Sequence, residues 1–137
     1  MALAGLAVAS TLAVAGCVMR TPPADLDLAR SRSAEAGRYV VTVAPASDPI
    51  PLGSMHAWTV EIRTPDGQPV EAAKIVVDGG MPQHGHGLPS QPAVTRYLGD
   101  GLYALEGMKF TMPGWWVLEF DVEGKSGRDG VTFNLML

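Results

Sequence analysis

The sequence predicts an all-β protein: an immunoglobulin-like antiparallel β-sandwich of about seven strands, preceded by a lipoprotein signal and a flexible tether. Three observations predict this class. From residue 39 onward, short runs are rich in β-branched and aromatic residues, apolar and polar residues alternate within them, and Gly, Pro and Asp separate them. The cysteine pair of antibody domains is absent, because Cys17 is the only cysteine.

Seven runs show the strand pattern, and they are residues 39–43, 56–63, 74–77, 94–98, 102–105, 116–122 and 131–135. The second run is the clearest, because its even-numbered positions are His, Trp, Val and Ile while polar residues occupy most of the others. Gly99-Asp100-Gly101 lies between two runs, and an Asp-Gly pair in that setting predicts a tight hairpin.

The N-terminus predicts export. Residues 2–16 carry no charge and end in small residues, which is typical of a secretory signal rather than of a membrane span. Val14-Ala15-Gly16-Cys17 resembles the bacterial lipobox, in which Cys17 carries the lipid and becomes the first mature residue. We therefore expect a signal peptide over residues 1–16 and an extracytoplasmic, periplasm-facing protein held to the membrane by lipid. Val18, in place of the Asp that retains lipoproteins at the inner membrane, favours the outer membrane.

The mature chain is predicted to hold one domain. Residues 17–37 are polar and short of aromatics, so they are expected to be the lipidated cysteine and a tether, with a brief helix near residues 24–29. Residues 38–137 form the expected sandwich, a suitable size for a single core. The net charge of −4 and the lack of a basic cluster argue against a nucleic-acid surface.

The segment 79–89, Gly-Gly-Met-Pro-Gln-His-Gly-His-Gly-Leu-Pro, is the candidate functional element. Its glycines and prolines predict a shaped loop that is neither helix nor strand. His84 and His86 are separated by one glycine and can face the same point, and Met81 adds a thioether. Imidazole and thioether ligands without a thiol or carboxylate favour copper, as Cu(I), over zinc. The alternative is a plain turn with solvated histidines.

Further ligands are expected from nearby positions. Met112 could supply a second thioether, with Met108 as a weaker candidate, although gap filling in a core is the commoner role of methionine. His56 could close the site if its end of the strand meets the loop, and otherwise it is a satisfied residue at the end of a sheet. Asp78 could orient an imidazole or cap a turn.

Trp115 and Trp116 are the candidate partner-binding residues. Adjacent residues of a strand point to opposite faces, so one of them is expected in the core and the other at the surface. An exposed tryptophan is a typical anchor for a protein partner, and covering a sheet edge is the alternative role.

The sequence does not predict an enzyme. Neither Ser54 nor Ser90 lies in a Gly-x-Ser-x-Gly elbow, and the chain has no P-loop and no His-Glu-x-x-His motif. A blue-copper centre would require a cysteine ligand, and Cys17 is the expected lipid site.

Two segments resemble known families. Residues 80–89 and residues 107–116, Gly-Met-Lys-Phe-Thr-Met-Pro-Gly-Trp-Trp, are similar to the YtkA-like and FixH-like families of small bacterial exported proteins, a likeness that covers residues 38–137. The resemblance implies an immunoglobulin-like sandwich with a loose link to copper handling and cytochrome oxidase maturation. FixH proper carries a membrane helix that this sequence lacks, so the YtkA-like lipoprotein form is the closer match.

The leading hypothesis is an envelope-anchored copper-binding lipoprotein that buffers one ion, or passes it to an envelope protein, in oxidase maturation or copper tolerance. Affinity should fall as pH drops, because the imidazoles must be deprotonated to bind. The rival is a metal-free interaction lipoprotein that presents the loop and an exposed tryptophan to an envelope complex. Convergence of the two histidines and a methionine sulfur would favour the first.

Overall fold

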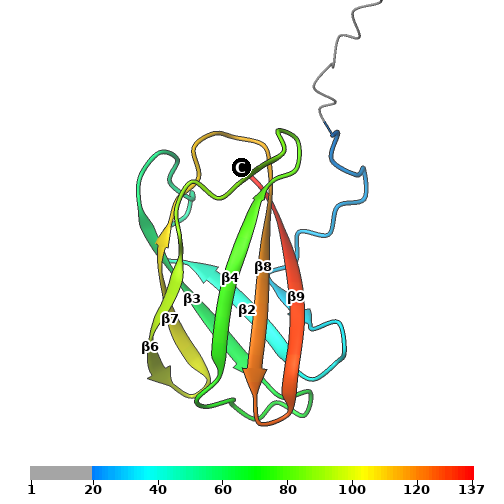
Figure 1. The fold of residues 1–137 in the computed structure, drawn as a ribbon, viewed down its shortest axis with the longest axis vertical. Coiled ribbons are helices and arrows are strands. Elements are labelled where there is room, and N and C mark those ends of the chain that lie inside the picture. The colour runs from blue at the N-terminus through cyan, green and yellow to red at the C-terminus, as the bar shows by residue number, and fades with distance from the viewer. Residues whose placement is uncertain (1–19) are drawn as a thin grey trace, which may run out of the picture.

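The computed structural model describes residues 20–137, which form two antiparallel sheets packed face to face (Figure 1). The strands are β1 (Ser31–Ser33), β2 (Val40–Pro45), β3 (His56–Arg63), β4 (Lys74–Met81), β5 (His86–Gly87), β6 (Ala93–Gly99), β7 (Leu102–Met108), β8 (Trp115–Gly124) and β9 (Gly127–Met136). One sheet has the order β1-β2-β3-β7-β6, and the other has the order β5-β4-β8-β9. The predicted β-sandwich is confirmed, and all seven expected runs are strands.

The two additional strands are short. β1 has three residues and β5 has two, so neither carries enough alternation to be recognised in the sequence. β5 changes the description of segment 79–89, which was expected to be neither helix nor strand. β4 continues to Met81, and Met81 pairs with His86 while Gly80 pairs with Gly87. The segment is therefore a β-hairpin.

The turn at Asp100-Gly101 is a tight hairpin as predicted. β6 ends at Gly99 and β7 begins at Leu102, which leaves a two-residue connection. Asp100 has a φ of 50° and Gly101 has a φ of 77°. Positive φ at both central residues is what a type I′ turn needs to match the twist of its strands.

The core lies between the sheets and follows the period of two. Along β8, Trp116, Leu118, Phe120 and Val122 are buried, while the alternate positions are partly or fully exposed. β3 and β9 contribute the same pattern from the two sheets. Aromatic rings fill the end of this core next to the β7–β8 loop, where Phe110 contacts Trp116 edge to face with ring centroids 5.2 Å apart. This packing fixes the strand ends that carry the loops.

The segment assigned to the tether joins the domain earlier than expected. β1 pairs with β2, and Ala34 is buried. The buried carboxylate of Asp129 accepts hydrogen bonds from the backbone N–H groups of Ala36 and Arg38, both at 2.9 Å. Residues 31–37 are therefore attached to the sandwich.

The helix expected near residues 24–29 is not present: the chain has only a turn at residues 24–25, directly after Pro22-Pro23. No helix in the described part of the chain has the length and apolar character that a membrane crossing requires. The predicted signal peptide and Cys17 lie outside the described residues.

Loops from both sheets meet at one end of the sandwich, drawn at the top of Figure 1. The β4–β5 hairpin, the β7–β8 loop and the C-terminus gather there. Gly114 and Leu137 exchange two backbone hydrogen bonds, and Gly53 donates to the carbonyl of Phe110 at 2.7 Å. Backbone hydrogen bonds therefore join the segments at the end of the sandwich that carries the candidate histidines.

Candidate metal centre

The hairpin that carries the histidines is shaped by its backbone. The N–H groups of His84 and Gly85 both donate to the carbonyl of Met81, at 3.1 and 3.0 Å. Gly85 has a φ of 65°, a conformation that glycine adopts without strain. A Cβ on Gly80 would lie 2.4 Å from the carbonyl oxygen of His86. β5 can therefore lie this close to β4 only because residue 80 has no side chain. The glycines of the segment thus bring the two histidines to one side of a tight turn.

The imidazoles of His84 and His86 are exposed neighbours. Their ring centroids are 5.9 Å apart, and the ring planes differ by 18°. A metal–nitrogen bond of about 2 Å places the centroids of two imidazoles on one ion about 5 to 6 Å apart. The separation is within the range of two imidazoles that share an ion, and convergence of their nitrogens on one point stays a prediction.

A backbone hydrogen bond sets the tautomer of the neutral His86 ring. Its Nδ1 lies 3.0 Å from the carbonyl oxygen of Gly87. A carbonyl oxygen only accepts, so Nδ1 carries the hydrogen and Nε2 keeps its lone pair. This is the arrangement that orients a metal-binding histidine. The His86 ring also packs edge to face against Trp116, with the ring centroids 5.5 Å apart.

The two candidate thioethers differ in their surroundings. Met81 is 1% exposed, and its methyl group lies 2.5 Å from where a Cβ on Gly114 would be. Met81 is thus packed between the hairpin and the β7–β8 loop. Met112 is 37% exposed on that loop, and its carbonyl accepts the indole N–H of Trp116 at 3.0 Å. Both methionines lie at the same end as the histidines, and their role as ligands stays a prediction.

Two residues that the sequence analysis did not single out hold the hairpin in place. The side-chain oxygen of Gln83 accepts the backbone N–H of Trp115 at 2.8 Å. The same oxygen lies 2.8 Å from the position of a Cβ on Gly114. Gln83 and Gly114 are positioning residues of the candidate centre. No local sequence pattern predicts a contact between residues so far apart in the chain, although Gln83 and Gly114 lie in the two segments that resemble the known families.

His56 does not join the pair. Its half-buried ring lies with its centroid 5.6 Å from that of Phe110 and 6.5 Å from that of Trp58, at the edge of the core. Phe110 in turn contacts Trp116, and Trp116 contacts His86. Two aromatic rings therefore stand between His56 and the hairpin.

The two tryptophans point to opposite faces, as expected for adjacent strand residues. Trp116 is fully buried in the core. Trp115 is half-buried on the outer face, where its indole N–H donates to the Asn134 side chain at 3.0 Å. Asp78 accepts the N–H of Gly79 at 2.8 Å, which fits the local backbone role rather than contact with an imidazole.

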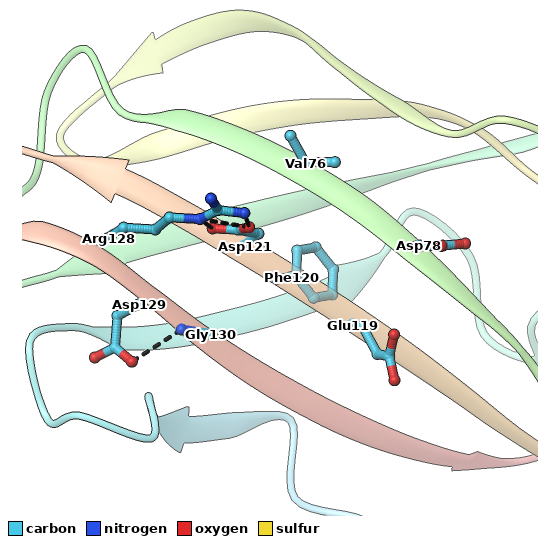
Figure 2. A pocket seen from close by; sticks show the side chains of 8 residues that line it. All are labelled: Val76, Asp78, Glu119, Phe120, Asp121, Arg128, Asp129 and Gly130. Carbon is cyan, nitrogen blue, oxygen red and sulfur yellow. Dashed lines mark hydrogen bonds and ion pairs between the residues drawn. The ribbon is translucent and has the colours of Figure 1, made fainter.

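A shallow hollow on the outer face of β4, β8 and β9 is acidic in character (Figure 2). Asp78 and Glu119 are cross-strand neighbours there, while Arg128 forms an ion pair with Asp121, its Nε 2.8 Å from the carboxylate. The hydrogen bonds from Arg128 lower the pKa of Asp121. Within residues 20–137, no three His, Cys, Asp or Glu side chains gather as a metal site. The hollow has the features of a solvated sheet face.

The comparisons with known proteins identify a family but no individual relative. No curated protein and no solved structure matches the chain. A family model described as YtkA-like matches residues 33–121, which is well over half of the sequence and includes both the histidine hairpin and the Trp115-Trp116 pair. The FixH-like part of the resemblance stays a prediction. The chain belongs to the YtkA-like family.

Proposed function

We propose that the protein binds a copper ion at the β4–β5 hairpin, with His84 and His86 as its principal ligands. The observation that supports this proposal best is the pair of exposed, nearly parallel imidazoles, 5.9 Å apart. The Nε2 lone pair of His86 is available because Nδ1 is held by the Gly87 carbonyl. Two ligands on one rigid turn require little reorganisation to bind an ion.

The chemistry of the donors favours Cu(I). Zinc sites normally use three or four nitrogen, sulfur or carboxylate ligands from the protein, and the described residues hold no cluster of three His, Cys, Asp or Glu. Thioethers select Cu(I), and Met81 and Met112 each place a thioether at this end of the sandwich. Met112 is partly exposed, so its sulfur is accessible to an ion at this end.

The proposed role is to hold and transfer copper rather than to catalyse a reaction. Both imidazoles are exposed, so an ion bound to them is open to ligands from a second protein. A lipid on Cys17 would hold the domain at the periplasmic side of a membrane, where a copper buffer or a donor to an envelope oxidase would act. Residues 20–30 provide the connection between that anchor and β1.

The test is a competition titration with a chromogenic Cu(I) chelator on residues 18–137, which retain every described residue. Wild type should hold one tight equivalent more than His84→Ala/His86→Ala. Since both side chains are exposed, the variant should melt within a few degrees of wild type. Equal copper binding by the two proteins would overturn the hairpin proposal, and no copper binding by either would leave the metal-free interaction module as the function to pursue.

A further inference from the structure

We infer a second binding site, for a soft monovalent cation such as Cu(I), at His56 and Met108 inside the loop end of the sandwich. It is separate from the hairpin and does not depend on copper binding there. The inference rests on an unpaired buried nitrogen, an adjacent thioether and the aromatic rings that surround them.

The His56 ring presents a lone pair to the interior. Nδ1 lies 3.1 Å from the carbonyl oxygen of Ser54, so Nδ1 is the protonated nitrogen. Nε2 is then an acceptor, and it is buried without any hydrogen-bond partner in the protein. Buried polar atoms are almost always paired, and an exception calls for a water or an ion at that place. The same tautomer in His86 leaves its Nε2 at the surface, where water can satisfy it.

Met108 is the residue opposite His56 across the sheet. The two are direct partners in the β3–β7 pairing, just beside a bulge. Direct cross-strand partners have Cβ atoms about 4.5–5.5 Å apart and project from the same face. Met108 is 0% exposed, and the His56 ring contacts core rings, so both side chains face the interior. The register therefore places the His56 imidazole and the Met108 thioether on the same inward face of neighbouring strands.

The surroundings select a monovalent, soft ion. Phe110 and Trp58 flank the His56 ring, and aromatic rings attract cations through their faces. The guanidinium of Arg30 lies over Trp58, with Cζ 5.3 Å from the ring centroid. Asp48 is the carboxylate that attracts the Arg30 guanidinium, and within residues 20–137 no ion pair joins the two side chains. A fixed positive charge repels a divalent ion twice as strongly as a monovalent one, and no carboxylate ligand compensates.

The site is closed in this conformation. The segment before β3 is tied over it by the hydrogen bond from Gly53 to the carbonyl of Phe110. Outside it, Met55 is 65% exposed and Leu52 is 45% exposed. An ion must therefore enter by opening of residues 50–55, so loading should be slower than at the exposed hairpin.

The test uses the His84→Ala/His86→Ala protein, in which the hairpin site is absent. Cu(I) is added in competition with the chromogenic chelator, and the ring nitrogens of His56 are followed by long-range ¹H–¹⁵N NMR. We expect one equivalent to bind and the His56 Nε2 signal to shift. Adding His56→Phe should abolish this equivalent, and adding Met108→Leu, which conserves volume, should weaken it at least tenfold. Adding Met55→Leu is the matched control at an exposed methionine and should change nothing.

The outcomes separate this inference from the proposed function. If His84→Ala/His86→Ala binds no Cu(I), or if binding survives His56→Phe, the second site is wrong, whatever wild type does. A buried water on Nε2 would give the first of these results. If wild type and His84→Ala/His86→Ala bind equally and His56→Phe abolishes that binding, the hairpin proposal fails and the second site stands.

Discussion

The hairpin histidines and His56 use the same anchoring contact in opposite environments. His86 and His56 each hold Nδ1 against a backbone carbonyl, at 3.0 and 3.1 Å, so both leave Nε2 without a hydrogen. At His86 that lone pair is at the surface, beside a second imidazole. At His56 it is buried among aromatic rings, with no partner. The contact of Nδ1 with a backbone carbonyl sets the tautomer of both rings. Burial then decides whether water can reach the Nε2 lone pair.

The difference in burial predicts a different rate of ion exchange at each site. An exposed pair of imidazoles exchanges its ion readily with another protein, because the incoming ligand has direct access. A buried nitrogen beside a thioether favours retention, because the ion must cross a closed segment. Substitutions at the two histidine environments and at the residues that support the fold test whether burial distinguishes them.

Asp129→Ala should destabilise the fold without changing either histidine environment. The carboxylate accepts three backbone N–H groups, from Ala36, Arg38 and Gly130. A hydrogen bond to a charged group contributes about 1.5–3 kcal/mol, and three of them share this one carboxylate, so a loss of at least about 3 kcal/mol in the free energy of unfolding is expected by chemical denaturation. Copper stoichiometry measured well below the melting temperature should be unchanged, and a lost equivalent would mean that the histidines depend on this distant contact.

The same residue predicts the acid response. Burial alone raises the pKa of Asp129, but the three N–H donors and Arg38 outweigh it, and the pKa is lowered. The resulting stabilisation is present above the unfolded-state pKa of about 3.9 and disappears as pH falls through the lower native value. Wild type should therefore lose more stability than Asp129→Ala as the pH is lowered from 5 toward 2. Parallel curves for the two proteins would contradict this account.

Gly114→Ala should disturb the hairpin and spare His56. A Cβ there would lie 2.5 Å from the Met81 methyl and 2.8 Å from the Gln83 oxygen, at a φ of 131°. The cost should be about 2 kcal/mol, because overpacking and a strained φ both contribute. The matched control is Gly53→Ala, which also has positive φ but nothing within 4 Å of the new Cβ. Only Gly114→Ala should weaken copper binding at the hairpin; equal effects would assign the loss to backbone strain alone.

His56→Phe should stabilise the metal-free protein by about 1 kcal/mol, while His86→Phe should change stability by less than about 0.5 kcal/mol. The first substitution removes a buried unpaired nitrogen, and the second alters an exposed side chain. Thermal melts with a copper chelator present measure both. Destabilisation by His56→Phe would show that Nε2 has a partner, such as a buried water, in the metal-free state.

Gln83→Ala should lower the free energy of unfolding by about 0.5–1 kcal/mol, because one hydrogen bond to the Trp115 N–H disappears. Gln83→Glu keeps an accepting oxygen and is the matched control. Hydrogen exchange of the Trp115 amide reports the contact directly and should accelerate only in the alanine variant. Unchanged exchange in Gln83→Ala would remove Gln83 from the residues that position the hairpin.

The sequence determined the sandwich, because strand alternation and turn chemistry are local properties. The β8 core residues can be read from a period of two, and the turn at Asp100-Gly101 from its residue types. It also brought His84 and His86 together, since one glycine separates them. The hairpin was less evident, because the two residues of β5 are too few to show a period.

The tertiary structure alone decided which distant residues meet. Placing His56 away from the hairpin required the packing of Phe110 and Trp116 between them, and pairing it with Met108 required the register of β3 against β7. The contact of Gln83 with Trp115 depends on two loops from different strands meeting at one end of the sandwich. Local residue types fix the period and the turns of a chain, whereas register and the burial of individual nitrogens follow from how the two sheets pack.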